Sequence, residues 1–261
     1  MENKRNSALE MSAEEFKAAG HQLVDQIAAF IEGIGDRPVT YGEKPTAIRS
    51  AIGMQSLPEQ GQPASQLLGK ASDLMFNHSL FNGHPKFWGY ITASASPIGA
   101  LGDMLTAAVN SNCGAFILSP MATEIEKQTI QWLAELIGYN NDCGGVLVSG
   151  GNMANFTGFL AGRTAKAGKR LKTSGVGSLG RKMTIYGSKG THTWIDKAAV
   201  LFGHGSDAIR WIETNEKHQM DNAKLEEAIK KDVAEGNQPF LVVGTAGDVS
   251  MGVVDDLTGI R

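Results

Sequence analysis

Apolar residues recur at helical spacing in the first part of the chain. Residues 12–15, Ser-Ala-Glu-Glu, match a capping box, and apolar side chains follow with a helical period until two glycines and Pro38 end the pattern. The period is carried by Phe16, Leu23, Ile27, Phe30 and Ile31. This predicts an amphipathic N-terminal arm. Because residues 36–63 are rich in Pro and Gly, either a second subunit or this chain is expected to cover its apolar stripe.

Further helices are predicted over residues 64–80, 97–109 and 120 to about 137. Ser119 and Pro120 suit the start of the last of these, and Gly138 suits its end. The segment 83–99, GHPKFWGYITASASPIG, lies between two predicted helices. It is too irregular for one long element and too apolar for a solvated linker, so it is interpreted as a buried or interface loop.

The stretch 144–162, GGVLVSGGNMANFTGFLAG, combines a short apolar run with a turn of small residues. Residues 146–148 predict a buried strand, and a helix is expected to begin directly after the turn Ser149-Gly150-Gly151-Asn152. Bare backbone at a helix N-terminus offers free N–H groups and a positive dipole end, which suit a phosphate. An ordinary glycine-rich turn without a ligand remains the alternative.

Strands and helices alternate in the last third of the chain. Strands are predicted at 183–186, 208–212 and 240–244, and helices at 193–202 and 221–235, whereas 164–180 is interpreted as a surface connector. The alternation predicts an α/β fold with a mainly parallel sheet and helices on both faces. Ligands of such folds bind at the carboxyl ends of the strands, so the turns at 149–152, 187–193 and 245–250 should converge. His192 suits either this site or a capping role, and Lys189 is interpreted as a solvated lysine.

Composition narrows the classes of function. With 42% hydrophobic and 20% charged residues, the 261-residue chain is expected to form one large α/β domain or two smaller ones. A net charge of -3 and a pI near 6.1 argue against nucleic-acid and membrane partners. Cys113 and Cys143 fit neither a disulfide framework nor a zinc pattern, so no metal is expected. The polar start, MENKRNSALE, and the lack of a long apolar run favour the cytoplasm.

Five motifs occur in an order that resembles one enzyme family. They are HPKFWGY (84–90), SPMATEIE (119–126), GVLVSGGNMAN (145–155), YGSKGTHTWIDKAA (186–199) and PFLVVGTAGDVSMGVVDDL (239–257). The chain resembles the group II pyridoxal-phosphate-dependent amino-acid decarboxylases, the aromatic-amino-acid and glutamate decarboxylase relatives of fold type I. The resemblance implies a helical arm and dimerisation segment at 1–80. It also implies the N-terminal part of the large, pyridoxal-5'-phosphate-binding domain at 81–261.

The resemblance also implies roles for individual residues. His192 is expected to stack on the cofactor ring and to help move protons, and residues 113–118 to reach the partner's active site across a homodimer. The implied cofactor-binding residues are Gly150, Gly151, Asn152, His192 and Thr245, and the implied substrate-binding residues are His84 and Thr92.

Two features depart from the family pattern. Asp248 occupies a position where the family usually has a hydroxyl residue, and a carboxylate near a phosphate is repulsive, so the loop should turn it away or cofactor binding should change. The family's aspartate for the ring nitrogen and its Schiff-base lysine are expected beyond Arg261. The chain is therefore expected to be a large-domain fragment, a truncated reading frame or one half of a split enzyme.

Three functions follow as alternatives. The first is decarboxylation of an aromatic or acidic L-amino acid to the amine and carbon dioxide, once a complementing C-terminal part is present. The second is a related fold-type-I lyase or aldehyde synthase. The third is a catalytically dead protein that acts in binding or interaction.

Overall fold

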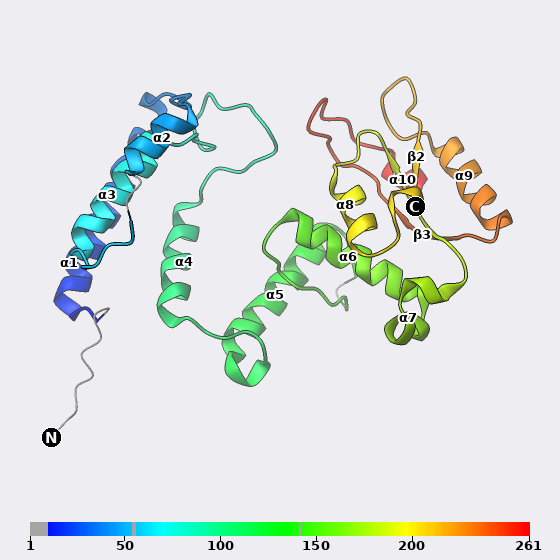
Figure 1. Cartoon of the computed structure of the whole chain (residues 1–261), viewed down its shortest axis with the longest axis horizontal. Coiled ribbons are helices and arrows are strands. Elements are labelled where there is room, and N and C mark those ends of the chain that lie inside the picture. The colour runs from blue at the N-terminus through cyan, green and yellow to red at the C-terminus, as the bar shows by residue number, and fades with distance from the viewer. Residues whose placement is uncertain (1–9, 54–55, 141) are drawn as a thin grey trace. The chain divides into compact units, whose positions relative to one another are not determined.

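The computed structural model describes residues 10–53, 56–140 and 142–261 (Figure 1). The chain divides into two compact units, Met1–Asn110 and Ser111–Arg261, which are described separately. Residues 1–9, which form most of the polar start that favours the cytoplasm, lie outside the described residues. Among the helices of the described ranges, none has both the length and the apolar character needed to cross a bilayer.

The first unit is helical. It contains α1 (Ala13–Gly33), a 3-10 turn (Ile34–Asp36), α2 (Pro45–Ile52), α3 (Ala64–Asn77) and α4 (Pro97–Val109). The predicted capping box is confirmed, because Ser12 Oγ accepts the Glu15 N–H at 3.1 Å and Glu15 Oε2 accepts the Ser12 N–H at 2.9 Å. Helix α2, with a proline in its first turn, lies within the Pro- and Gly-rich segment and was not predicted.

Part of the apolar stripe of α1 is covered by this chain. The rings of Phe30 and Phe76 stack at 4.4 Å between centroids, and Phe81 meets Phe30 edge-on at 5.2 Å. These contacts join α1 to α3 and to the segment after it. Phe16, nearer the start of α1, is still 53% exposed. The arm is therefore anchored at its C-terminal end and open to solvent at its N-terminal end.

The aromatic segment 83–99 is not a buried loop within this unit. Trp88 is 92% exposed and Tyr90 is 79% exposed, and Tyr90 has a positive φ of 61°. The neighbouring helix α4 is apolar in composition, yet all of its residues are exposed. The expectation of burial is thus wrong for the described first unit, and a role at an interface stays a prediction.

The second unit is an α/β structure around a three-stranded sheet of order β2-β1-β3. Both strand pairs are parallel, as predicted. The strands are β1 (Met183–Ser188), β2 (Ile209–Ile212) and β3 (Gln238–Val242). The helices are α5 (Pro120–Leu136), α6 (Gly151–Ala167), α7 (Lys169–Ser174), α8 (Trp194–Leu201), α9 (Asn222–Ala234) and α10 (Leu257–Ile260), with 3-10 turns at Phe116–Leu118, Val176–Leu179 and Ser206–Ala208.

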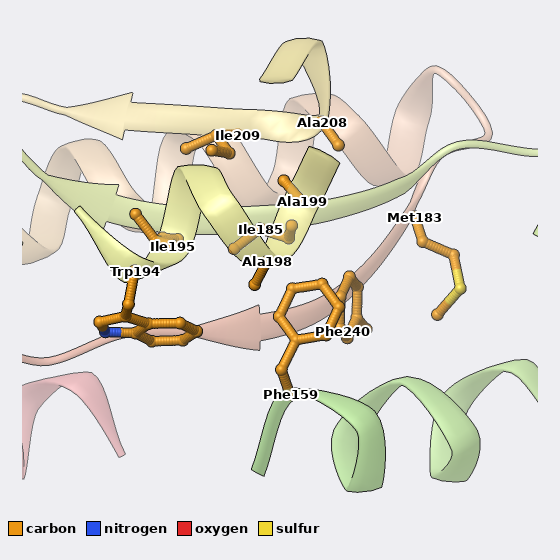
Figure 2. Packing of buried hydrophobic residues seen from close by; sticks show 10 residues of the cluster. All are labelled: Phe159, Met183, Ile185, Trp194, Ile195, Ala198, Ala199, Ala208, Ile209 and Phe240. Carbon is orange, nitrogen blue, oxygen red and sulfur yellow. The ribbon is translucent and has the colours of Figure 1, made fainter. Parts of the chain in front are cut away.

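Alternate side chains of β1 pack on opposite faces of the sheet. Ile185 faces α6 and α8, where Phe159 points toward Phe240 (Figure 2). Tyr186 faces the other way and packs with Leu225 of α9. Because successive side chains in a strand point to opposite faces, this pattern places helices on both faces of the sheet, as predicted.

A buried ion pair fixes α9 to the sheet. Asp232 on α9 accepts a two-pronged hydrogen bond from Arg210 on β2, with distances of 2.7 to 3.2 Å, and a bond from Tyr186 Oη at 2.6 Å. Burial raises the pKa of Asp232, but the hydrogen bonds from Arg210, Tyr186 and Asn237 outweigh it and hold the pKa below its usual range. Burial and the Asp232 carboxylate raise the pKa of Tyr186.

Two secondary-structure predictions are wrong. Residues 146–148 form an exposed irregular segment and not a buried strand, because no strand of the described residues pairs with it. The predicted connector at 164–180 is mostly helical, since α6 continues to Ala167 and is followed by α7 and a 3-10 turn. Lysine and arginine are good helix formers, so the glycines at 168 and 175 interrupt this segment without making it irregular.

Candidate functional site

A hollow of about 560 Å³ lies where the N-terminus of α6 meets the turn after β1. It is lined by Ser149, Gly150, Gly151, Asn152, Met153, Asn155 and His192. The turn at 149–152 and His192 are 40 residues apart in sequence, and the fold brings them to one place. This confirms that these two predicted turns converge.

The start of α6 leaves backbone donors open toward this hollow. Gly150 has a φ of 143°, which favours glycine, and no side chain of the described residues caps the helix there. The first intrahelical bond is donated by Ala154 to the Gly150 carbonyl at 3.0 Å, so the N–H groups before it are not used within the helix. A Cβ at Gly151 would meet no atom within 4 Å. The space is therefore open and suited to an anion.

His192 is exposed and its ring is oriented by its own turn. Its Nδ1 accepts the Trp194 N–H at 3.2 Å, so in the neutral ring Nε2 carries the proton. The turn itself is tight, because Thr191 Oγ1 accepts the Ser188 N–H at 3.1 Å. A Cβ at Gly187 would lie 3.0 Å from Ile195 Cδ1, which explains a glycine there. The sequence from β1 to α8 thus presents an imidazole with a free donor at the hollow.

The turn at 245–250 lies beside the turn that carries His192. A Cβ at Gly190 would lie 3.8 Å from the Cβ of Asp248, so the third predicted turn also joins the group. Thr245 is half-buried, and Asp255 Oδ2 accepts its N–H at 2.8 Å. Thr245 is not among the residues that line the hollow. Its contact with a cofactor stays a prediction.

Asp248 turns its carboxylate into its own loop. The carboxylate accepts the N–H groups of Ser250 at 2.8 Å, Met251 at 2.7 Å and Val253 at 3.2 Å. These hydrogen bonds, that from the Met251 N–H most of all, hold the pKa of Asp248 below its usual range. The direction of this carboxylate relative to a bound phosphate, and any change in cofactor binding, stay predictions.

His84 and Thr92 lie in the first compact unit. His84 is 4% exposed, its Nδ1 accepts the Lys86 N–H at 3.0 Å and its Nε2 contacts the Arg37 carbonyl at 2.9 Å. Both ring nitrogens are therefore engaged within the unit, and the ring shapes the start of the aromatic loop. Thr92 is exposed. Their roles toward a substrate, and that of residues 113–118 toward a partner, stay predictions.

Asn155 and Met153 line the hollow but were absent from the sequence-based site. Asn155 lies four residues after Gly151, which in a helix is the same face one turn later. Helical spacing from the glycine turn would have identified Asn155. Met153 could not be found in this way, because only the open geometry of the first turn exposes it to the hollow.

The model of the pyridoxal-dependent decarboxylase conserved domain matches residues 46–261. The chain belongs to this family. An aromatic-L-amino-acid decarboxylase of Bacillus atrophaeus is 30% identical over 249 residues, which cover 95% of this chain and 50% of that protein. Tyrosine decarboxylase 2 of Arabidopsis thaliana is 30% identical over 262 residues, which cover 95% of this chain and 46% of that protein. The chain thus spans about half the length of the curated relatives it matches.

Solved structures of the family have the same fold. Tryptophan decarboxylase of Catharanthus roseus, in complex with L-tryptophan, matches with a TM-score of 0.84 and 26% identity over 97% of this chain and 54% of that chain. The 4-hydroxyphenylacetaldehyde synthase of Rhodiola rosea matches with a TM-score of 0.82 and 26% identity over 96% of this chain and 54% of that chain. The α/β architecture is therefore that of the fold-type-I decarboxylases, as predicted.

Proposed function

We propose that this chain supplies the phosphate-binding part of a pyridoxal-phosphate-dependent amino-acid decarboxylase. The observation that carries the proposal is the hollow at the N-terminus of α6, where uncapped backbone N–H groups and His192 meet. Membership of the pyridoxal-dependent decarboxylase family supports the same cofactor. The complete activity is proposed for the whole protein, because the chain spans about half the length of its relatives.

The residues at the hollow fit the cofactor's phosphate. Gly150 and Gly151 leave the backbone bare, and the space that a Cβ of Gly151 would enter is open, so an anion can approach the N–H groups. The N–H and side chain of Asn152 would donate to the same anion. Asn155, one helical turn further, adds a carboxamide donor to this wall.

His192 is proposed as the catalytic residue of this half of the site. Its Nδ1 is engaged by the Trp194 N–H, which fixes the ring and leaves the Nε2 proton available for transfer. The face of the same ring would stack on the bound cofactor. When bound, pyridoxal phosphate supplies a ring that takes up the electron pair left by the departing substrate carboxylate.

The proposed substrate is an aromatic L-amino acid, with an acidic one as the alternative. The relatives named aromatic-L-amino-acid, tryptophan and tyrosine decarboxylases support the aromatic class. A second candidate reaction is formation of an aldehyde, favoured by the likeness to the Rhodiola rosea synthase. The product of an aromatic substrate, amine or aldehyde, distinguishes the two candidates.

The active form is proposed to be a homodimer. Exposed apolar side chains on α1, on the aromatic loop and on α4 support it, because patches of this kind usually mark association sites. In the domain organisation proposed for the complete enzyme, residues 1–80 form the helical arm and dimerisation segment. Residues 81–261 contribute to the large domain. Light scattering of the purified chain would measure the dimer directly.

The test of cofactor binding is a phosphorus NMR titration of pyridoxal phosphate with the 261-residue chain. The Gly151→Val variant should bind about tenfold more weakly, because the branched side chain covers donors that a phosphate needs. Gly158→Val is the matched control, since it lies on the same helix, in open space and outside the hollow. Equal affinities of wild type and Gly151→Val would contradict the proposed phosphate site.

The test of the reaction is release of carbon dioxide from carboxyl-labelled amino acids. The chain is combined with a polypeptide that carries the C-terminal half of the Bacillus atrophaeus relative, and L-tryptophan, L-tyrosine and L-glutamate are compared. His192→Ala should abolish release while the chain still folds. Absence of release with every substrate, in a complex shown to form and to bind the cofactor, would count against decarboxylation.

A further inference from the structure

The segment that leads into the phosphate turn is irregular and has no strand partner. Residues 146–148 are exposed and belong to no ladder of the described sheet. A segment without ladder bonds needs another source of order if it is to place the turn that follows it. The structure supplies that source from helix α5.

Two residues on one face of α5 hold this segment. Glu126 Oε1 accepts the Leu147 N–H at 2.7 Å. One helical turn later, Ile130 lies so close to Gly145 that a Cβ there would be 2.7 Å from Ile130 Cγ2. The only long-range side-chain bond to the segment that the described residues show is thus the one from Glu126.

The two contacts between α5 and the segment agree with a single relative direction of the helix and the segment. Glu126 meets Leu147, and Ile130, four residues later on the helix, meets Gly145, two residues earlier in the segment, so the segment runs antiparallel to α5. The distance of 2.7 Å between the Leu147 nitrogen and Glu126 Oε1 is that of a well-formed hydrogen bond. The contact from Glu126 therefore fixes the register of the segment against α5.

We propose that Glu126 is a positioning residue for the phosphate-binding turn. It acts through Leu147, which precedes Ser149 by two residues, and it sets where the N-terminus of α6 points its free donors. The inference rests on the proposed phosphate site. It assigns Glu126 a role through acceptance of the Leu147 N–H.

Two substitutions of Glu126 distinguish the loss of its hydrogen-bond acceptor from the loss of its negative charge. Glu126→Gln keeps an oxygen that can accept the Leu147 N–H, and Glu126→Ala removes it. Glu124→Ala is the matched control on the same exposed helix, because Glu124 contacts Lys127 at 3.9 Å and not the segment. Gly145→Ala tests the second contact, since its Cβ would push against Ile130. Circular dichroism and thermal melting establish that each variant folds.

The experiment measures two quantities on each variant of the 261-residue chain. The first is the affinity for pyridoxal phosphate by phosphorus NMR. The second is hydrogen exchange of the Leu147 amide, together with the backbone shifts of residues 149–152. We expect Glu126→Ala to weaken cofactor binding about tenfold, to expose the Leu147 amide and to move the turn's shifts. Glu126→Gln and Glu124→Ala should stay close to wild type.

The outcomes separate this inference from the proposed function. Binding and exchange unchanged in Glu126→Ala would overturn the positioning role, and so would an equal loss in Glu126→Gln, which would assign the effect to charge. If the wild type binds no pyridoxal phosphate, the proposed phosphate site fails. The positioning role then stands if Glu126→Ala alone moves the shifts of residues 149–152, and it falls if they stay in place.

Discussion

Acid should weaken the core of the second unit through His204. This residue follows α8, stacks on Phe240 at 5.3 Å and meets the edge of Phe159 at 5.5 Å, while Arg163 is the charged neighbour. Burial, followed by the Arg163 charge, lowers the pKa of His204 from its usual 6.5 to about 4. The folded chain therefore holds a neutral ring where the unfolded chain would bind a proton.

The direction and size of the effect follow from linkage. Since the folded pKa is lowered, the neutral ring costs no stability above about pH 6.5, and stability falls as the pH drops from there toward about 4. For a shift of this size the loss at about pH 5 is about 2 kcal/mol relative to about pH 7.5. That loss is a large share of the free energy of unfolding of a typical domain, which is about 5–15 kcal/mol.

The assay is urea unfolding followed by tryptophan fluorescence at about pH 5 and about pH 7.5. In His204→Phe the ring contacts with Phe159 and Phe240 are retained and the titration is removed, so the stability difference between the two pH values should shrink by about 2 kcal/mol. The carboxylates contribute equally to the pH dependence of stability in the wild type and in His204→Phe, so their contribution cancels in the comparison. His21→Gln, at an exposed position of α1, is the control. An unchanged pH dependence in His204→Phe would refute the reasoning.

Three other substitutions test separate features of the fold. Asp232→Ala should destabilise the second unit by about 3 kcal/mol in urea unfolding, because it leaves Arg210 and Tyr186 without their shared partner, whereas Glu227→Ala on the exposed side of α9 should not. Asp248→Ala should loosen residues 248–253 in hydrogen exchange without raising the affinity for pyridoxal phosphate, and a tighter-binding variant would show that the carboxylate does repel the phosphate. Ser12→Ala should lower the helix content of α1 in circular dichroism at a cost of about 1 kcal/mol, and an unchanged spectrum and melting curve would show that the capping box does not contribute.

Local signals in the sequence were sufficient for most elements of the fold. The capping box at Ser12, the proline at the start of α5 and the Asp221 cap of α9 each mark a helix start that the structure confirms. These signals act within one helical turn, so they do not depend on the rest of the fold. The parallel sheet followed from the alternation of strands and helices, which is also a local pattern.

Contacts between distant segments account for what the sequence did not show. The apolar run at 146–148 has the composition of a strand, but a strand forms only where a neighbour supplies ladder bonds, and here Glu126 supplies a single bond from a helix. Composition alone therefore could not distinguish a strand from an irregular segment held by a side chain.

In the loop after β3, too, contacts that the sequence does not reveal determine the surroundings of a charged residue, Asp248. Asp248 next to a phosphate turn predicts repulsion when only charge is counted, since nothing in the sequence reveals the direction of the carboxylate. Three N–H groups of its own loop, between 2.7 and 3.2 Å away, give that charge local partners. A carboxylate with these local donors stabilises the turn beside the one that carries His192, so Asp248 has a structural role that its charge alone did not reveal.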